Sequence, residues 1–133
     1  MEYYYHYLAN PYQGTEEERH YRAEMTAKVC ISLLRKGIPV LSPIVHNHAL
    51  IQSLGPFTLE ERRQIFLTFD FNLLKHARSM IVLTLDGWKT SYGVQAEIEF
   101  CSKQQIPVLY EDPERLLLDT IPEEFLFKLS EVP

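Results

Sequence analysis

The sequence predicts an α/β fold in which helices cover both faces of a parallel sheet. Short apolar segments alternate with longer segments of helical spacing, and this alternation is typical of parallel strands joined by right-handed crossovers. Residues 79–85 are apolar on both faces, as in a strand covered on both sides. The chain has 133 residues, of which 46% are hydrophobic, so we expect one domain (1–133) with its own core.

The first strand and the first helix are marked by their ends. Tyr3–Ala9 is rich in aromatic residues and stops at Asn10-Pro11, which indicates a strand. Thr15 and Glu18 have the spacing of a capping box, in which each side chain accepts a backbone amide at a helix start. The helix is expected to extend to about Lys36. Its apolar face is predicted to consist of Ala23, Ala27, Cys30, Ile31 and Leu34.

The next segment contains a short strand and several breaks. Residues 38–41 are apolar and predict a second strand, which Ser42-Pro43 ends because proline lacks the amide donor of a sheet ladder. We expect a loop with a short helix over 46–54, broken at Gly55-Pro56.

The remaining elements complete the alternation. Thr58 and Glu61 form a second capping box, which opens a helix to about Ala77. The expected elements after it are a strand at 79–85, a loop at 86–88, a helix at 91–103 with Val94, Ile98 and Cys101 on one stripe, a strand at 106–110, and one or two short helices in 113–133.

Composition limits the possible partners. The net charge of −5 provides no bulk attraction to nucleic acid or to an anionic membrane, and no apolar run is long enough to span a bilayer. Cys30 and Cys101 lie 71 residues apart in apolar helical contexts, which favours free thiols. The N-terminus lacks the basic region of a signal peptide, so a cytoplasmic location is expected.

A ligand site is expected at the carboxyl ends of the first and third strands. With the strand order 2-1-3-4, the order reverses between these strands, and ligands of open parallel sheets bind at that point. Residues 7–12 and 85–93 follow these strands and combine small residues with aromatic ones. Ser91 is a candidate N-cap, whose free amides attract anions, and Glu97 lies about 9 Å further along the helix.

Two carboxylates are candidates for chemistry, each with a plainer alternative. Glu97 either faces this crevice or is a solvated helix carboxylate, as we expect for Glu99. Asp70 lies in an apolar run and is either at an exposed helix edge or turned into a pocket. Two carboxylates facing one pocket would divide the roles of nucleophile and general acid.

Together these residues resemble the nucleoside 2-deoxyribosyltransferase superfamily, and within it a small bacterial and phage branch that lacks an assigned function. The matching features are, in order, Tyr7-Leu8-Ala9-Asn10-Pro11-Tyr12, Ser42-Pro43-Ile44, Asp70, and Gly87-Trp88-x-x-Ser91-x-Gly93-x-x-x-Glu97. The resemblance implies a flavodoxin-like three-layer fold with four or five parallel strands. It also implies a dimer or larger homo-oligomer, and chemistry without a metal or organic cofactor.

The resemblance also assigns roles. Glu97 would attack the anomeric carbon and release the nucleobase, Asp70 would protonate the base, and Tyr7 would hold the nucleophile. Trp88 would stack on the base or pack on the following helix. The expected substrate contacts are Ser91, Gly93, Asn10, Tyr12, Trp88, Gly87, His46 and Arg19. A metal site at His46-Asn47-His48 is disfavoured, because no cysteine or third histidine is near in sequence.

One departure bears on the substrate. Enzymes of the superfamily that act on free nucleosides commonly have an acid six residues before the nucleophile, where this chain has Ser91. That serine is similar to the phosphate-contacting serine of the 2'-deoxynucleoside 5'-phosphate N-hydrolases, and a hydroxyl can donate to phosphate. A nucleoside monophosphate is therefore favoured. Arg19 and Arg22 are candidate phosphate partners, or else part of a solvated basic face.

Two other functions stay open at this point. The first is a non-catalytic protein that senses a nucleotide on the same fold. The second is cleavage of a larger nucleotide of the NAD type by the same glutamate. The base, the choice of ribose or deoxyribose, and the choice of hydrolysis or transfer are also open.

Overall fold

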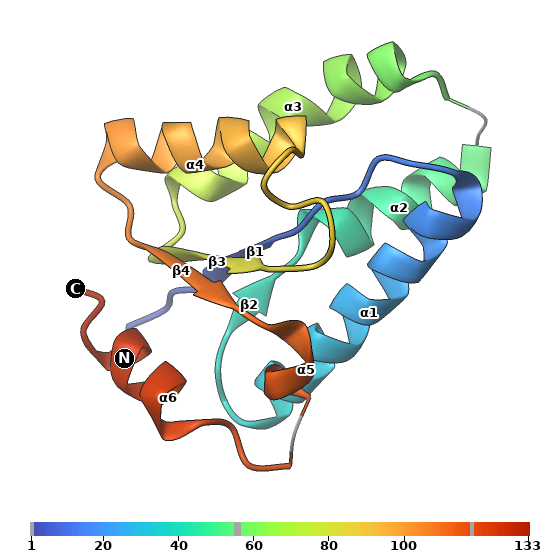
Figure 1. The fold of residues 1–133 in the computed structure, drawn as a ribbon. Coiled ribbons are helices and arrows are strands. Elements are labelled where there is room, and N and C mark those ends of the chain that lie inside the picture. Colours follow the sequence, from blue (N-terminus) through green and yellow to red (C-terminus); the bar gives the residue numbers. More distant parts are fainter. Residues whose placement is uncertain (1, 55–56, 118) are drawn as a thin grey trace.

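The computed structural model describes residues 2–54, 57–117 and 119–133 (Figure 1). A four-stranded parallel sheet with the order β2-β1-β3-β4 forms its centre, which confirms the predicted α/β class and strand order. In chain order, the described elements are β1 (His6–Ala9), α1 (Glu16–Arg35), β2 (Val40–Leu41), α2 (Pro43–Leu54), α3 (Leu59–Lys75), β3 (Ser79–Leu83), α4 (Tyr92–Gln104), β4 (Val108–Glu111), α5 (Pro113–Leu116) and α6 (Glu123–Ser130).

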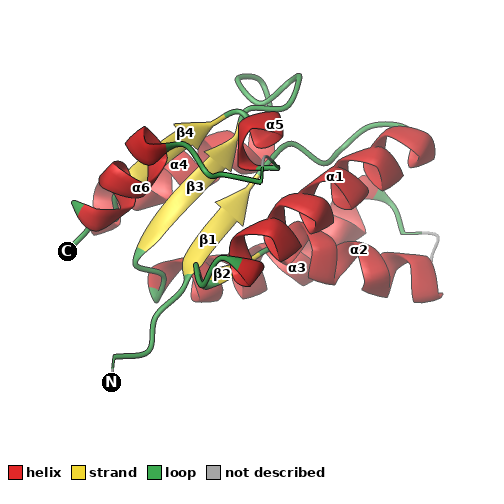
Figure 2. Ribbon diagram, turned by 90° about the horizontal axis from the view of Figure 1, so that it is seen from below, coloured by secondary structure: helices red, strands yellow, loops and turns green. Residues whose placement is uncertain are grey.

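Alternation along the central strands divides the core into two layers. Leu8 of β1 is paired with Ile81 of β3, and both pack against α1, α5 and α6. Tyr7 and Met80, the preceding pair, face the opposite side and pack with α3 and α4. Figure 2 shows α1, α5 and α6 in front of the sheet and α3 and α4 behind it. The protein is therefore a three-layer α/β/α domain.

Both predicted capping boxes are confirmed. The Glu18 amide donates to Thr15 Oγ1 at 3.1 Å, and the Thr15 amide donates to Glu18 Oε1 at 3.0 Å. Thr58 and Glu61 make the same reciprocal pair at the start of α3. These local hydrogen bonds depend on residues three apart, which is why the sequence alone located both helix starts.

The prediction of a loop with a short helix over 46–54 was wrong, because α2 begins earlier, at Pro43. Ser42 Oγ accepts the amide of Val45 at 3.1 Å, so Ser42-Pro43 starts a helix as well as ending β2. Proline suits the first helical position, where its missing amide donor is not needed. The predicted break at Gly55-Pro56 lies outside the described residues.

The predicted apolar face of α1 was also partly wrong. Ile31 and Leu34 are 48% and 47% exposed, whereas Leu33 is fully buried. The buried stripe includes the polar Thr26, whose hydroxyl donates to the backbone oxygen of Arg22 and lies 3.0 Å from Asn10 Oδ1. A pattern of apolar residues does not include a threonine whose hydroxyl is hydrogen-bonded inside the protein. The predicted buried face of α1 was therefore displaced from the observed one.

Other expectations concern thiols, membranes and assembly. Cys30 and Cys101 are free, as predicted. Among the described helices, none has the length and apolar character needed to cross a bilayer. In α6, Phe125 is buried in the core, while Leu126 and Phe127 are exposed. The homo-oligomer implied by the resemblance stays a prediction.

Two neighbouring leucines of α1 test the observed core. Leu33→Ala should lower the free energy of unfolding by roughly 2–5 kcal/mol, because it leaves a cavity beneath the sheet. Leu34→Ala, the matched control, should change it by less than about 1 kcal/mol, because Leu34 is half-exposed. Urea unfolding followed by circular dichroism measures both. Equal losses would contradict the observed orientation of α1.

Candidate active site

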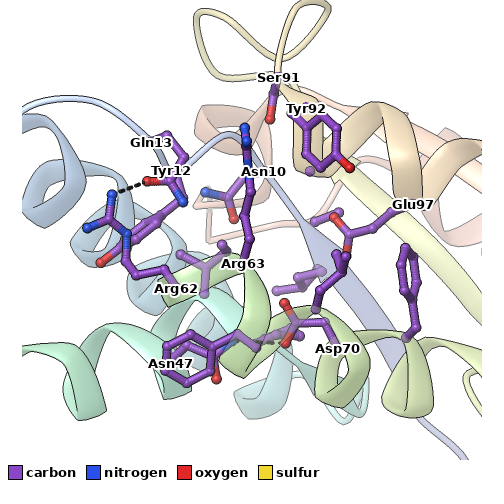
Figure 3. Close-up of a pocket in the computed structure, with 18 of the residues that line it drawn as sticks. Asn10, Tyr12, Gln13, Asn47, Arg62, Arg63, Asp70, Ser91, Tyr92 and Glu97 are labelled. Carbon is purple, nitrogen blue, oxygen red and sulfur yellow. Dashed lines mark hydrogen bonds between the residues drawn. The ribbon is translucent and has the colours of Figure 1, made fainter. Parts of the chain in front are cut away.

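A pocket opens beyond the carboxyl ends of β1 and β3, on the side of the sheet covered by α3 and α4 (Figure 3). Helix α2 and the first two turns of α4 complete its wall. The cavity has a volume of about 110 Å³ and is open to solvent on one side. The pocket lies where the strand order reverses, as the sequence predicts.

Glu97 lies inside this pocket, joined to the sheet by a hydrogen bond. The Tyr7 hydroxyl donates to Glu97 Oε2. Tyr7 is only 1% exposed in the middle of β1, so its ring has little freedom to move. Glu97 faces inward because Val94 and Cys101, one turn before and after it, are buried on the same side of α4. Glu99 instead is exposed and pairs with Lys103 at 3.1 Å, so the two glutamates differ as the sequence suggested.

The environment of Glu97 favours its neutral form. The pKa of Glu97 is raised to about 8, mainly by burial and also by the nearby Asp70 carboxylate, while the Tyr7 hydrogen bond lowers it. Burial and the neighbouring carboxylates also raise the pKa of Tyr7 well above its usual value. Tyr7 therefore keeps its proton and remains a hydrogen-bond donor to Glu97.

Asp70 is turned into the same pocket from α3, which selects the second of the two alternatives for this residue. The Asn47 amide donates to Asp70 Oδ1 at 2.9 Å, and Asn47 Oδ1 in turn lies 2.9 Å from His46 Nδ1. Burial raises the pKa of Asp70 to about 6, while the Asn47 hydrogen bond and the nearby His46 lower it. These pKa values favour an ionised Asp70 and a protonated Glu97 near neutral pH.

Two arginines of α3 that were not among the predicted site residues, Arg62 and Arg63, also line the pocket. The Arg63 guanidinium lies 4.3 Å from the centre of the Tyr92 ring, near the start of α4. Arg62 donates to Gln13 Oε1 at 2.6 Å and to the backbone oxygen of Phe57 at 2.8 Å. Arg63 precedes Asp70 by seven residues, about two helical turns, and this spacing was a signal that could have found it.

Four of the predicted substrate contacts line the pocket: Asn10, Tyr12, Ser91 and Gly93. The Asn10 amide donates to the backbone oxygen of Pro11, and the Tyr12 hydroxyl lies 2.6 Å from His48 Nδ1. Ser91 caps α4 by accepting the Val94 amide at 3.3 Å. Each contact with a substrate stays a prediction, but these side chains are in position to make one.

The other predicted contacts lie outside the pocket lining. Trp88 packs on Tyr110 of β4, with ring centres 5.3 Å apart, and against the core cluster that includes Val94 of the following helix. Gly87 has a φ of 90° and serves the turn before α4. His46 is exposed and stacks on Phe69. Its contact with the pocket lining is the hydrogen bond with Asn47.

The two arginines predicted as phosphate partners are engaged elsewhere. Arg19 donates to the backbone oxygen of Gly14 at 2.7 Å, and Arg22 donates to that of Gln13. Both belong to α1, one turn apart, and neither lines the pocket. In the described part of the chain, no three His, Cys, Asp or Glu side chains are grouped as metal ligands would be.

Comparison with known proteins adds one finding. A family model described as "Domain of unknown function (DUF1937)" matches residues 5–112, which include all four strands and every residue of the pocket. No curated protein matches the chain.

The raised pKa of Glu97 predicts a pH-dependent stability. Between the ordinary glutamate pKa of 4.5 and about 8, the folded protein holds a proton that the unfolded chain releases, so stability falls as pH rises. Glu97→Gln removes this loss. It should be more stable than the parent by up to about 5 kcal/mol at pH 9, and nearly equal to it at pH 4.5.

Urea unfolding at several pH values measures this difference. Glu99→Gln is the control on the same helix, because Glu99 is exposed and should give a small difference that is the same at every pH. Parallel stability curves for Glu97→Gln and the parent would show that Glu97 titrates normally.

Proposed function

We propose a function from the pocket itself, because the chain belongs to the DUF1937 family and the description of that family names no activity. The protein cleaves the N-glycosidic bond of a nucleoside or a nucleoside 5'-monophosphate, with Glu97 as the nucleophile. The observation that carries this proposal is a carboxyl held by a buried tyrosine and facing a second carboxyl in one pocket. The resemblance to the nucleoside 2-deoxyribosyltransferase superfamily supports the same roles for Glu97, Asp70 and Tyr7.

The first step forms a glycosyl-enzyme. A Glu97 oxygen attacks C1' of the sugar as the bond from C1' to the base nitrogen breaks, and the electron pair of that bond leaves with the base. Asp70 donates a proton to the departing base. Positive charge grows on the sugar ring during this step, and the nearby carboxylates stabilise it.

The second step releases the sugar. Water attacks C1' on the face that the base has left, gives its proton to Asp70, and the ester bond to Glu97 breaks. A second base in place of water would complete a transfer reaction, and both outcomes remain within the proposal. Two displacements at C1' retain its configuration. The scheme uses no metal or organic cofactor.

The protons must exchange before the first step. The pKa values favour a neutral Glu97 and an ionised Asp70, whereas attack requires the reverse. The pKa values of about 8 and about 6 differ by two units, so this exchange costs roughly 3 kcal/mol. That cost is small beside a glycosidic barrier. The Tyr7 hydrogen bond lowers it by favouring the carboxylate of Glu97.

The groups that line the pocket also support one orientation of the substrate within it. Ser91 and the amides at the start of α4 lie at one end, beside the Arg63 guanidinium, and these groups suit a 5'-phosphate. Arg63 has no carboxylate partner among the described residues. With the sugar at Glu97 and the phosphate at this end, the base lies toward Asp70.

Glu97→Ala should lower base release from nucleoside 5'-monophosphates by at least about 10³-fold, because no other group replaces the nucleophile. Glu99→Ala should keep the parent rate, because Glu99 is on the outer side of the same helix. Chromatography of the released base measures both, and separates hydrolysis from transfer when a second base is added. Undiminished turnover in Glu97→Ala would refute the assignment.

The same assay distinguishes the alternatives. Thermal stabilisation of the parent by a nucleotide, without release of its base, would favour the sensing function. Release of nicotinamide from NAD, but of no base from monophosphates, would favour the larger substrate.

The two carboxyl groups predict a bell-shaped dependence of kcat/KM on pH, with limbs near 6 and 8. In Asp70→Asn the general acid is lost, so the rate should fall roughly 10²–10⁴-fold and the decline at high pH should disappear. The remaining limb rises with pH and has its midpoint below 8, because the Asp70 charge no longer raises the pKa of Glu97. A variant that keeps the decline above pH 8 would exclude Asp70 as the acid.

A further inference from the structure

Gln13 and Arg62 line the end of the pocket opposite the carboxyl groups, and each has a hydrogen-bond donor without a partner among the described residues. Gln13 Oε1 accepts from Arg62 Nη2 at 2.6 Å, which determines the orientation of the Gln13 amide. Its nitrogen is then directed to the pocket side, as Figure 3 shows. Arg62 Nε is buried and has no hydrogen-bond partner among the described residues. Both unused groups, the Gln13 Nε2 amide and the Arg62 Nε–H, are donors.

An apolar slot connects this donor edge with Asp70. Arg62, Phe66 and Asp70 succeed one another at four-residue intervals on α3, and all three line the pocket. Phe66 packs with Ile51 and Tyr12, which form the apolar sides of the slot. The distance along the helix from Arg62 to Asp70 is about 12 Å, enough for a flat heterocycle between the two side chains.

In the proposed reaction the base lies between these ends. Asp70 must reach the ring nitrogen that leaves the sugar, so the far edge of the base points toward Gln13 and Arg62. That edge carries an oxo group in guanine, hypoxanthine, uracil and thymine, and an amino group in adenine and cytosine. An oxo group accepts from the Gln13 amide, whereas an amino group meets that amide as a second donor.

We propose that Gln13 and Arg62 select nucleotides whose base has an oxo group at this edge, and reject those with an amino group. This selectivity rests on the proposed function, because it takes the position of the base from the attack of Glu97 on C1'. Arg62 positions Gln13 through its Nη2 bond, and the Gln13 Nε2 amide donates to the oxo oxygen.

Binding to the non-cleaving Glu97→Gln variant tests this selectivity. Inosine and adenosine 5'-monophosphate differ at the far edge by oxo against amino and by a hydrogen on the adjacent ring nitrogen, and so do uridine and cytidine 5'-monophosphate. Calorimetry should give Kd values at least about tenfold lower for the oxo member of each pair, with ribose and deoxyribose forms alike. Equal affinities within both pairs would overturn the proposal.

A single substitution gives a sharper test. Gln13→Glu, made in the Glu97→Gln background, keeps an oxygen for Arg62 but replaces the amide donor with an acceptor. The preference should then shift toward the amino member of each pair by at least about tenfold. Gln64→Glu is the matched control, because Gln64 is exposed on α3, bonds to Glu60, and lies outside the pocket lining. It should leave the preference unchanged.

The same donors would also suit a phosphate group, and the experiment separates this case. If Gln13→Glu weakens ribose 5-phosphate and every nucleotide by the same factor, the donor edge binds phosphate and the proposal is wrong. If Glu97-dependent cleavage occurs without any preference between oxo and amino bases, the selectivity fails while the proposed function stands. If no nucleotide is bound or cleaved, both fail.

Discussion

The hydrogen bond from Tyr7 to Glu97 is the interaction on which the site depends, because it joins the central strand of the sheet to helix α4. A carboxyl surrounded by protein is costly to ionise, and burial accordingly raises the pKa of Glu97 to about 8. A single neutral donor only partly offsets that cost. The protein thus keeps a carboxyl group that is destabilising when charged, at the place where a growing positive charge would favour its ionised form.

Helix α3 places basic side chains at one end of the pocket and an acidic side chain at the other. It contributes Arg62 and Arg63 toward one end and Asp70 toward the other, with Phe66 between them. An acid-lined end suits a sugar that becomes positively charged, and a donor-lined end suits acceptor groups of a ligand. The chain as a whole is acidic, with a net charge of −5, so these arginines act locally and not through a bulk field.

Sequence patterns predicted the elements that depend on hydrogen bonds between near neighbours in the chain. They failed for features that depend on contacts between distant residues. The capping boxes at Thr15 and Thr58 involve residues three apart, so their pattern is readable in the chain. The start of α2 was missed because Ser42-Pro43 suits both the end of a strand and the first turn of a helix. The buried face of α1 was misplaced because it includes the polar Thr26, whose hydroxyl lies against Asn10 of the loop after β1 and the backbone oxygen of Arg22.

By itself, the sequence determined the order of the elements, the parallel sheet, and the identity of Glu97, Asp70 and Tyr7 as candidates. These depend on periodicity, on capping and on a resemblance in motif spacing. Only the tertiary structure decided that Asp70 points inward onto Asn47, and that Arg62 and Arg63 line the pocket while Arg19 does not. Which face of a helix meets a pocket depends on packing between elements far apart in the chain, and no local pattern records it.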